Sequence, residues 1–264
     1  MVPGDGKTIP GGGAHPCTVL AARGLVKQFG ALRAVDGIDL TIGAGDRVAV
    51  LGPNGAGKTT TLLMLLGVIT PDAGTIDILG HALPRHRSRA MQHVGFVAGY
   101  LPLPDRVTVG EALELFAGFY GMRGRAADQA VAAGLARFRL EHLADRPCME
   151  LSSGQRTLAG IAKSTLHRPQ LLVLDEPTAS LDPDVADRVR TGLLELNRDE
   201  GTALLVTSHN MPEVEQICER VMFVNAGRVV ADGTPTDVAA QYGHAGLEGV
   251  FLHLARGDLE GGVA

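Results

Sequence analysis

Apolar residues gather in short uninterrupted runs, which alternate with longer stretches where they recur at helical spacing. Three runs of strand length cover residues 47–51, 171–174 and 203–207; a Gly-rich turn follows the first, and polar residues follow the other two. Continuous runs of this kind are typical of central strands buried on both faces. Because strands and helices alternate over most of the chain, the pattern predicts an α/β fold with a mostly parallel sheet covered by helices on both faces.

The strand pattern stops between about residues 105 and 168. In this stretch Val109, Ala112, Leu113, Phe116 and Tyr120 follow one another at helical spacing. Thr108 and Glu111 have the spacing of a capping box, in which each residue hydrogen-bonds the other's main chain at a helix start. We therefore expect a helical subdomain inserted into the sheet domain.

The two ends of the chain carry different patterns. Residues 18–42 alternate around a turn near Phe29 and Gly30, which predicts an antiparallel β flap. Segments 221–224 and 228–231 flank Asn-Ala-Gly and predict a hairpin. Residues 1–17, rich in Gly and Pro, are expected to be a disordered tail. We assign 18–243 to one domain and make no structural prediction for 244–264.

Composition narrows the class of protein. The 264 residues are 45% hydrophobic with a net charge of −5, so general attraction to nucleic acid is not expected. A cluster at Arg85, His86, Arg87 and Arg89 is read as solvated surface. The longest apolar stretch, around 62–69, is far shorter than the ~20 residues of a membrane-spanning helix. A cytoplasmic location is expected, and the three scattered cysteines have no metal or redox spacing.

A glycine-rich loop follows the first apolar run. It reads Gly52, Pro53, Asn54, Gly55, Ala56, Gly57, Lys58, Thr59, with Thr60 next, and fits G-x-x-x-x-G-K-[ST] between a predicted strand and a helix over 58–66. In such a loop main-chain N–H groups turn onto phosphates. Lys58 would neutralise phosphate oxygens and Thr59 would hold Mg²⁺. The loop predicts binding of nucleotide phosphates.

Two carboxylates, Asp175 and Glu176, follow the buried run 171–174. Adjacent carboxylates without a cation repel each other, and a metal-bound nucleotide would relieve that cost. Asp175 would then serve the Mg²⁺, and Glu176 would act as general base on the water that attacks the γ-phosphate. The other interpretation is that both acids cap the turn at Pro177. Parallel strands end at one edge of a sheet, so Gly52, Asp175, Glu176 and His209 should converge there.

Residues 151–155, Leu-Ser-Ser-Gly-Gln, precede another helical pattern, and Ser152 and Gln155 are spaced as a second capping box. Alone this marks only a helix start. Together with the phosphate loop and the acidic pair, however, the sequence from about 18 to 240 resembles the ATP-binding subunits of ABC transporters, which are P-loop NTPases. Residues 151–155 match the family signature, and Ser180, Leu181 and Asp182 match its D-loop.

The resemblance implies roles for further residues and partners. His209 stands where the family has its switch histidine, and Phe29 where an aromatic side chain stacks on adenine. Two subunits, identical or paralogous, would pair head to tail. The nucleotide bound by Lys58 of one chain would then face four residues of the other: Ser152, Gly154, Gln155 and Asp182. A separate membrane permease would be the partner at the inner face of the membrane, and the sequence is similar to the export branches that handle drugs or polysaccharides.

The sequence departs from the family pattern at two positions. Gly99 stands where the family usually has a Gln that reaches Mg²⁺, which puts metal binding and coupling through this loop in doubt, and Ser153 replaces a Gly of the signature. The loop that follows, Tyr100 to Leu103, would either contact the permease or pack on the sheet.

Two other functions stay open. Soluble ABC ATPases act on ribosomes or DNA, but they carry two cassettes or very long insertions, whereas this chain has one motif set with a short insertion. A protein that binds ATP without hydrolysing it is disfavoured because Glu176 and His209 are both present.

Overall fold

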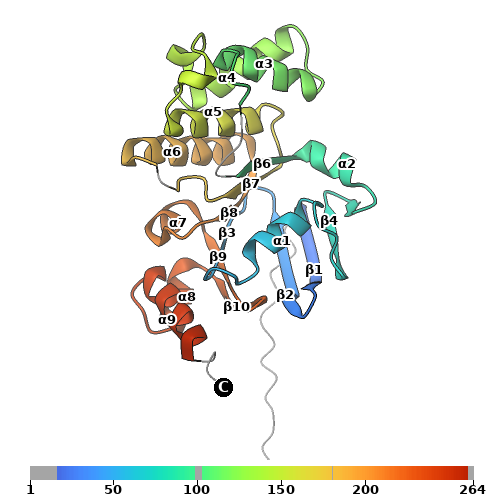
Figure 1. Cartoon of the computed structure of the whole chain (residues 1–264), viewed down its shortest axis with the longest axis vertical. Helices are drawn as coiled ribbons and strands as arrows, with labels where there is room; N and C mark the ends of the chain where they lie inside the picture. The colour runs from blue at the N-terminus through green and yellow to red at the C-terminus, as the bar shows by residue number, and fades with distance from the viewer. Residues whose placement is uncertain (1–16, 99–102, 180, 261–264) are drawn as a thin grey trace, which may run out of the picture.

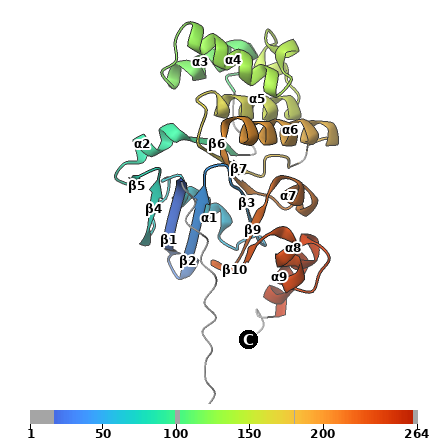
Figure 2. The same cartoon turned by 180° about the vertical axis from the view of Figure 1, so that it is seen from behind.

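The structure is a computed structural model that describes residues 17–98, 103–179 and 181–260. Two sheets lie within these residues, with helices around them (Figure 1, Figure 2). The strands are β1 (Thr18–Phe29), β2 (Leu32–Gly43), β3 (Arg47–Leu51), β4 (Ala73–Ile78), β5 (His81–Leu83), β6 (Val94–Ala98), β7 (Leu171–Asp175), β8 (Ala203–Thr207), β9 (Arg220–Asn225) and β10 (Arg228–Gly233). The helices are α1 (Lys58–Leu65), α2 (Arg87–Ala90), α3 (Val109–Phe119), α4 (Arg125–Arg137), α5 (Ser153–Thr165), α6 (Pro183–Glu200), α7 (Met211–Ile217), α8 (Pro235–Gln241) and α9 (Leu247–Glu260).

The larger sheet has the order β10-β9-β3-β8-β7-β6. Neighbouring strands are parallel except for the β9–β10 hairpin, which is antiparallel. Successive residues point to opposite faces: Val48 and Val50 belong to one buried cluster, and Ala49 and Leu51 belong to the other. The continuous apolar runs thus reflect burial on both faces, and the predicted α/β fold class is confirmed.

The smaller sheet is antiparallel, with the order β2-β1-β4-β5. The predicted flap corresponds to β1 and β2, whose hairpin turns between Phe29 and Leu32. Strands β4 and β5 were not predicted; β4 joins the flap along the other edge of β1. Helix α1 contacts β1 and β2, so that the flap, α1 and one face of the larger sheet share a core.

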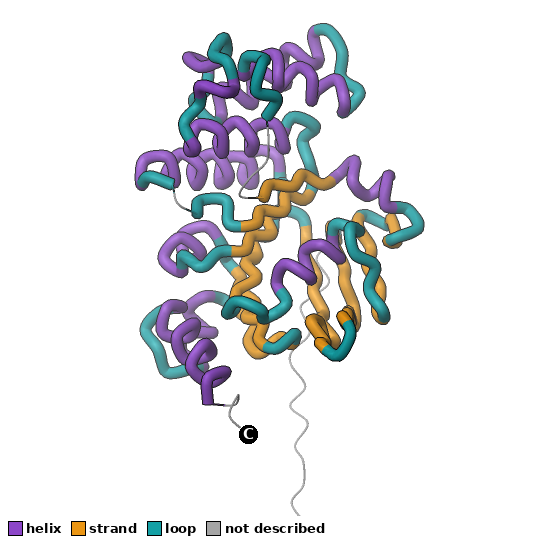
Figure 3. Tube along the Cα trace, in the orientation of Figure 1, coloured by secondary structure: helices purple, strands orange, loops and turns teal. Residues whose placement is uncertain are grey.

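Every regular element between residues 105 and 168 is a helix, as the sequence predicts. Figure 3 shows its helices as one group at the end of the molecule, beyond the strands. Helix α5 contacts α3, α4, α6 and β6, and thereby joins this group to the sheet. Phe138 is fully buried against Gly192 of α6, where an added Cβ would lie 2.4 Å from its ring. A side chain at position 192 would therefore displace this contact between the two parts.

The segment without a sequence prediction, 244–264, contains α9. Leu247 is buried at its start and its N–H donates to Glu215 Oε1 at 2.8 Å, while Val250 is buried against the core one turn later. The predicted tail lies outside the described residues except for Cys17, which is exposed. Across the described ranges, no helix combines the length and the apolar character needed to span a bilayer.

Candidate functional site

The glycine-rich loop connects β3 to α1, and its conformation requires glycine at both ends. Gly52 has φ of 144° and Gly57 has φ of 104°, backbone angles that residues with a Cβ rarely adopt. A Cβ on Gly52 would lie 2.0 Å from the Val224 carbonyl oxygen, and one on Gly57 would lie 2.3 Å from that of Ala34. The loop therefore packs directly against the backbones of β9 and β2.

The β9–β10 turn fixes this loop from outside. Gly227 N–H donates to the Ala56 carbonyl at 2.9 Å, and the Gly227 carbonyl accepts from Asp36 N–H at 2.8 Å. Gly227 is itself close-packed on Ala34. The hairpin predicted from the sequence thus joins the loop to the flap.

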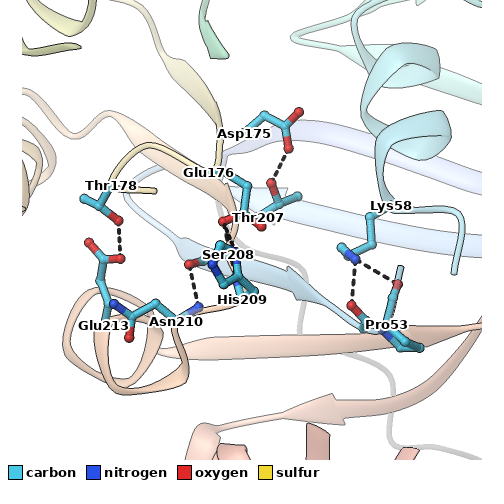
Figure 4. Close-up of polar contacts among 11 residues, drawn as sticks. Pro53, Lys58, Asp175, Glu176, Thr178, Thr207, Ser208, His209, Asn210 and Glu213 are labelled. Carbon is cyan, nitrogen blue, oxygen red and sulfur yellow. Dashed lines mark hydrogen bonds and ion pairs between the residues drawn. The ribbon is translucent and has the colours of Figure 1, made fainter. Parts of the chain in front are cut away.

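Lys58 lies in the first turn of α1 and turns back over the loop (Figure 4). Its ammonium donates to the carbonyl oxygens of Gly52 at 2.6 Å and Pro53 at 3.0 Å. Burial lowers the pKa of Lys58, while the nearby carboxylates of Glu176 and Asp175 act in the opposite direction. A phosphate oxygen can replace the two carbonyl acceptors. Its negative charge would then compensate the positive charge of the half-buried ammonium.

The acidic pair stands at the end of β7, beside the end of β8 (Figure 4). Asp175 Oδ1 accepts a hydrogen bond from the Thr207 hydroxyl at 2.5 Å. Glu176 Oε2 lies 2.8 Å from His209 Nδ1 and accepts from His209 N–H at 3.3 Å. The charges of both carboxylates act on Lys58, so the segments that follow β3, β7 and β8 bring the five side chains of Lys58, Asp175, Glu176, Thr207 and His209 into one site.

Glu176 has φ of 53°, in the left-handed region that a residue with a side chain rarely occupies. Its N–H donates to the Thr207 carbonyl at 3.0 Å, and its own carbonyl accepts from Ala179 N–H at 3.2 Å. The turn around Pro177 is thus closed by the main chain of Glu176, whereas the two carboxylates contact Thr207 and His209. This arrangement favours the nucleotide interpretation over two acids that merely cap a turn.

The residues present fit a magnesium ion. Asp175 and the exposed Thr59 offer carboxylate and hydroxyl oxygens, the donors that Mg²⁺ prefers. In the part of the chain that the structure describes, no group of three or more His, Cys, Asp or Glu could cage a metal on its own. A cation here would take its remaining ligands from nucleotide phosphates and water, as Mg²⁺ commonly does.

The signature residues do not lie with Lys58. Ser152 caps α5: its hydroxyl accepts from Gln155 N–H at 3.3 Å, and Gln155 Oε1 accepts from Ser152 N–H at 3.0 Å. Ser152 is exposed, whereas Gly154 is buried against Val185. Figure 1 shows α5 with the helical group and α1 beside the flap. Within one chain, therefore, the signature residues at the start of α5 lie apart from Lys58 at the start of α1.

The remaining predicted positions are scattered. Asp182 is exposed at the N-cap of α6, and Phe29 is 47% exposed at the end of β1. Gly99, Tyr100, Leu101 and Ser180 lie outside the described residues. Leu103, the last residue of the loop beyond Gly99, is buried in the core.

Sequence reasoning missed one contact next to the site. The Thr178 hydroxyl donates to Glu213 Oε2, and both residues are buried (Figure 4). Glu213 follows His209 by four residues, and Thr178 follows Glu176 by two, but nothing in the sequence indicates that the two meet.

Comparison with known proteins bears on this site directly. Residues 35–179, which span the glycine-rich loop, Ser152 and the acidic pair, match the family described as "ABC transporter". The chain belongs to the ABC transporter family. Nod factor export ATP-binding protein I of Ralstonia nicotianae is 38% identical to this subunit over 87% of the chain and 71% of the relative. The "Probable multidrug ABC transporter ATP-binding protein YbhF" of Escherichia coli K12 is 37% identical over 85% of the chain and 38% of the relative.

Solved structures agree with this assignment. An ATP-binding subunit of an ABC transporter superposes with a TM-score of 0.81 and 28% identity, covering 90% of this chain and all of that one. The cbiO1 subunit from Clostridium perfringens, part of a transporter complex, superposes with a TM-score of 0.78 and 27% identity over 86% of this chain and 92% of that one. This ABC protein is an ATP-binding subunit that hydrolyses ATP.

Proposed function

We propose that this ABC subunit drives export of a substrate through a separate membrane permease, on which it sits as a peripheral protein at the inner face of the membrane. Support comes from relatives of 37–39% identity that are named as Nod factor export or multidrug proteins. The chain holds one set of nucleotide-binding motifs, which suits a subunit that pairs with another. The substrate would be selected by the permease.

The contact between Glu176 and His209 is the observation that carries our assignment of the reacting groups. With Nδ1–H donating to Glu176 Oε2, the imidazole stabilises the ionised carboxylate and fixes its direction. Glu176 then accepts the proton of the water that attacks the γ-phosphate, and Lys58 offsets the negative charge of the phosphate oxygens. Phe29 presents an exposed ring on which adenine would stack.

Mg²⁺ would be held by Thr59 and Asp175 and, when bound, would supply positive charge to the phosphate oxygens. The Asp175 carboxylate is held by the Thr207 hydroxyl, which leaves its second oxygen for this purpose. The ammonium of Lys58 and the cation would thus both offset the negative charge of the phosphates.

We further propose that hydrolysis requires a dimer. The N-terminal N–H groups of α5 form an anion site, because they lack partners within the helix and the helix dipole is positive there. Ser152, Gly154 and Gln155 stand at this end, apart from Lys58 of the same chain. They would complete the nucleotide site of a second copy or a paralogous ATPase subunit, with Asp182 close by at the start of α6.

The variant Glu176→Gln tests the catalytic assignment. It keeps the shape of the side chain but removes the base, so ATP hydrolysis should fall by at least about a hundredfold while ATP binding persists and an ATP-bound dimer accumulates in light scattering. Glu215→Gln is the matched control: Glu215 is an exposed acid on α7, and the Gln keeps an acceptor for Leu247 N–H. Full hydrolysis by Glu176→Gln would exclude Glu176 as the base.

The transport assignment needs a separate test. The tagged subunit should purify from detergent-extracted membranes of its own cells with a membrane protein of several spanning helices in constant ratio. If it purifies only with ribosomes or as a soluble complex, the transporter role is wrong and the role of a soluble ABC ATPase is correct.

A further inference from the structure

Beyond β7 and β8 the two chain segments run side by side, and three side-chain contacts join them in order (Figure 4). The first links Asp175 to Thr207, and the second links Glu176 to His209. The third, from Thr178 to Glu213, is the only one of these in which both side chains are buried, at 8% and 7% exposure. The series extends from the end of the sheet to the first turn of α7.

The third contact, between Thr178 and Glu213, buries a carboxyl group, and this burial by itself destabilises the fold. Glu213 Oε1 is buried and makes no hydrogen bond within the part of the chain that the structure describes. Burial raises the pKa of Glu213, while the Thr178 hydroxyl and Arg190 of α6 act in the opposite direction. A buried carboxyl with one unpartnered oxygen destabilises a fold relative to an apolar residue of similar size. Its presence here indicates a role other than stability.

The geometry around Glu176 indicates what that role is. Glu176 occupies the left-handed region, which a residue with a Cβ leaves unless its neighbours are fixed. On one side, its N–H is bound to the Thr207 carbonyl. On the other side, Thr178 is anchored two residues later by Glu213. The strained residue is therefore held at both ends.

We propose that Glu213 is a positioning residue for hydrolysis: through Thr178 it fixes the backbone of Glu176, and so keeps the Glu176 carboxylate against His209. This inference rests on the proposed role of Glu176 as the base. It assigns the contribution of Glu213 to the hydrolytic step and not to nucleotide binding, because the side chains of Glu213 and Thr178 hydrogen-bond each other and not the glycine-rich loop.

The test compares kcat with ATP affinity in purified full-length protein. Thr178→Val removes the hydroxyl without changing shape, and Glu213→Ala removes its acceptor. Each should lower kcat roughly tenfold or more, with the Kd for a fluorescent ATP analogue changed by less than about twofold. Thr178→Ser and Glu213→Gln retain a donor and an acceptor and should restore most of the rate. Glu215→Gln, on the same helix, is the control for loss of an acidic charge.

A double-mutant cycle separates positioning from unrelated damage. If one hydrogen bond transmits the effect, Thr178→Val combined with Glu213→Ala should be no slower than the worse single variant. The proposal is wrong if Thr178→Val leaves kcat unchanged, if the two losses multiply, or if Glu213→Gln is as slow as Glu213→Ala. Should Glu213→Ala not fold, the Thr178→Val and Thr178→Ser pair decides alone. Glu176→Gln in the same assay distinguishes failure of this proposal from failure of the catalytic assignment.

Discussion

The two capping boxes of this chain provide an internal comparison for the dimer proposal. Thr108 begins α3 and Ser152 begins α5, and in both boxes the side chain accepts from the main chain three residues later, at 3.2 and 3.3 Å. Both residues lie at exposed or partly exposed helix starts. Only Ser152 is proposed to face a phosphate of the partner subunit.

Truncation of either side chain to Ala should therefore have a similar structural cost. Loss of an N-cap costs about 1 kcal/mol, which in a chain of this size lowers Tm by about 2–4 °C. Ser152→Ala should in addition lose a hydrogen bond to a charged group, worth about 1.5–3 kcal/mol, or roughly a 10- to 150-fold loss of ATPase rate. Thr108→Ala should hydrolyse ATP at nearly the wild-type rate.

Differential scanning fluorimetry and steady-state phosphate release measure the two effects in the same samples. Equal loss of activity in both variants would show that helix capping alone explains the requirement for Ser152. Full activity of Ser152→Ala would remove this residue from the nucleotide site.

Two further predictions follow from single side chains. Phe29→Ala should weaken ATP binding roughly 5- to 150-fold through lost base stacking, whereas Leu32→Ala, on the same turn, should not. Fluorescence titration measures both Kd values, and equal values for the two variants would contradict adenine stacking. Burial lowers the pKa of His167 below its usual 6.5, so the fold favours the neutral ring and is destabilised as pH falls below that value. His167→Phe, which keeps a ring to stack on Tyr120, should show a smaller drop in Tm between about pH 7.5 and 5.5; parallel Tm curves would contradict this.

Elements with strong local signals were predicted closely. β3 and β8 begin and end where their runs do, since burial on both faces leaves polar residues only at their ends, Arg47 in β3 and Thr207 in β8. The starts of α3 and α5 follow from their capping boxes, which are local hydrogen bonds between residues three apart. The glycine-rich loop was predictable because its function imposes residue types at fixed spacing.

Other features depend on contacts between distant residues. Helix α9 follows Gly243 and Gly246 and contains Gly249, and its start is held by Glu215 of another helix. The Thr178–Glu213 contact joins residues 35 apart, so no periodicity records it. The sequence predicted a set of residues for nucleotide binding, but it could not indicate that the buried side chains of Thr178 and Glu213 meet beside them.

A mixing experiment tests the central claim, that each nucleotide site is built from two chains. Lys58→Ala removes the phosphate contact of one half-site, and Ser152→Asp keeps a good helix cap but places a carboxylate against the phosphate. Each variant alone should be inactive. An equal mixture should recover about a quarter of the wild-type ATPase rate, since half of the dimers are mixed and each holds one intact site. A mixture that stays inactive, although its subunits exchange, would contradict the account.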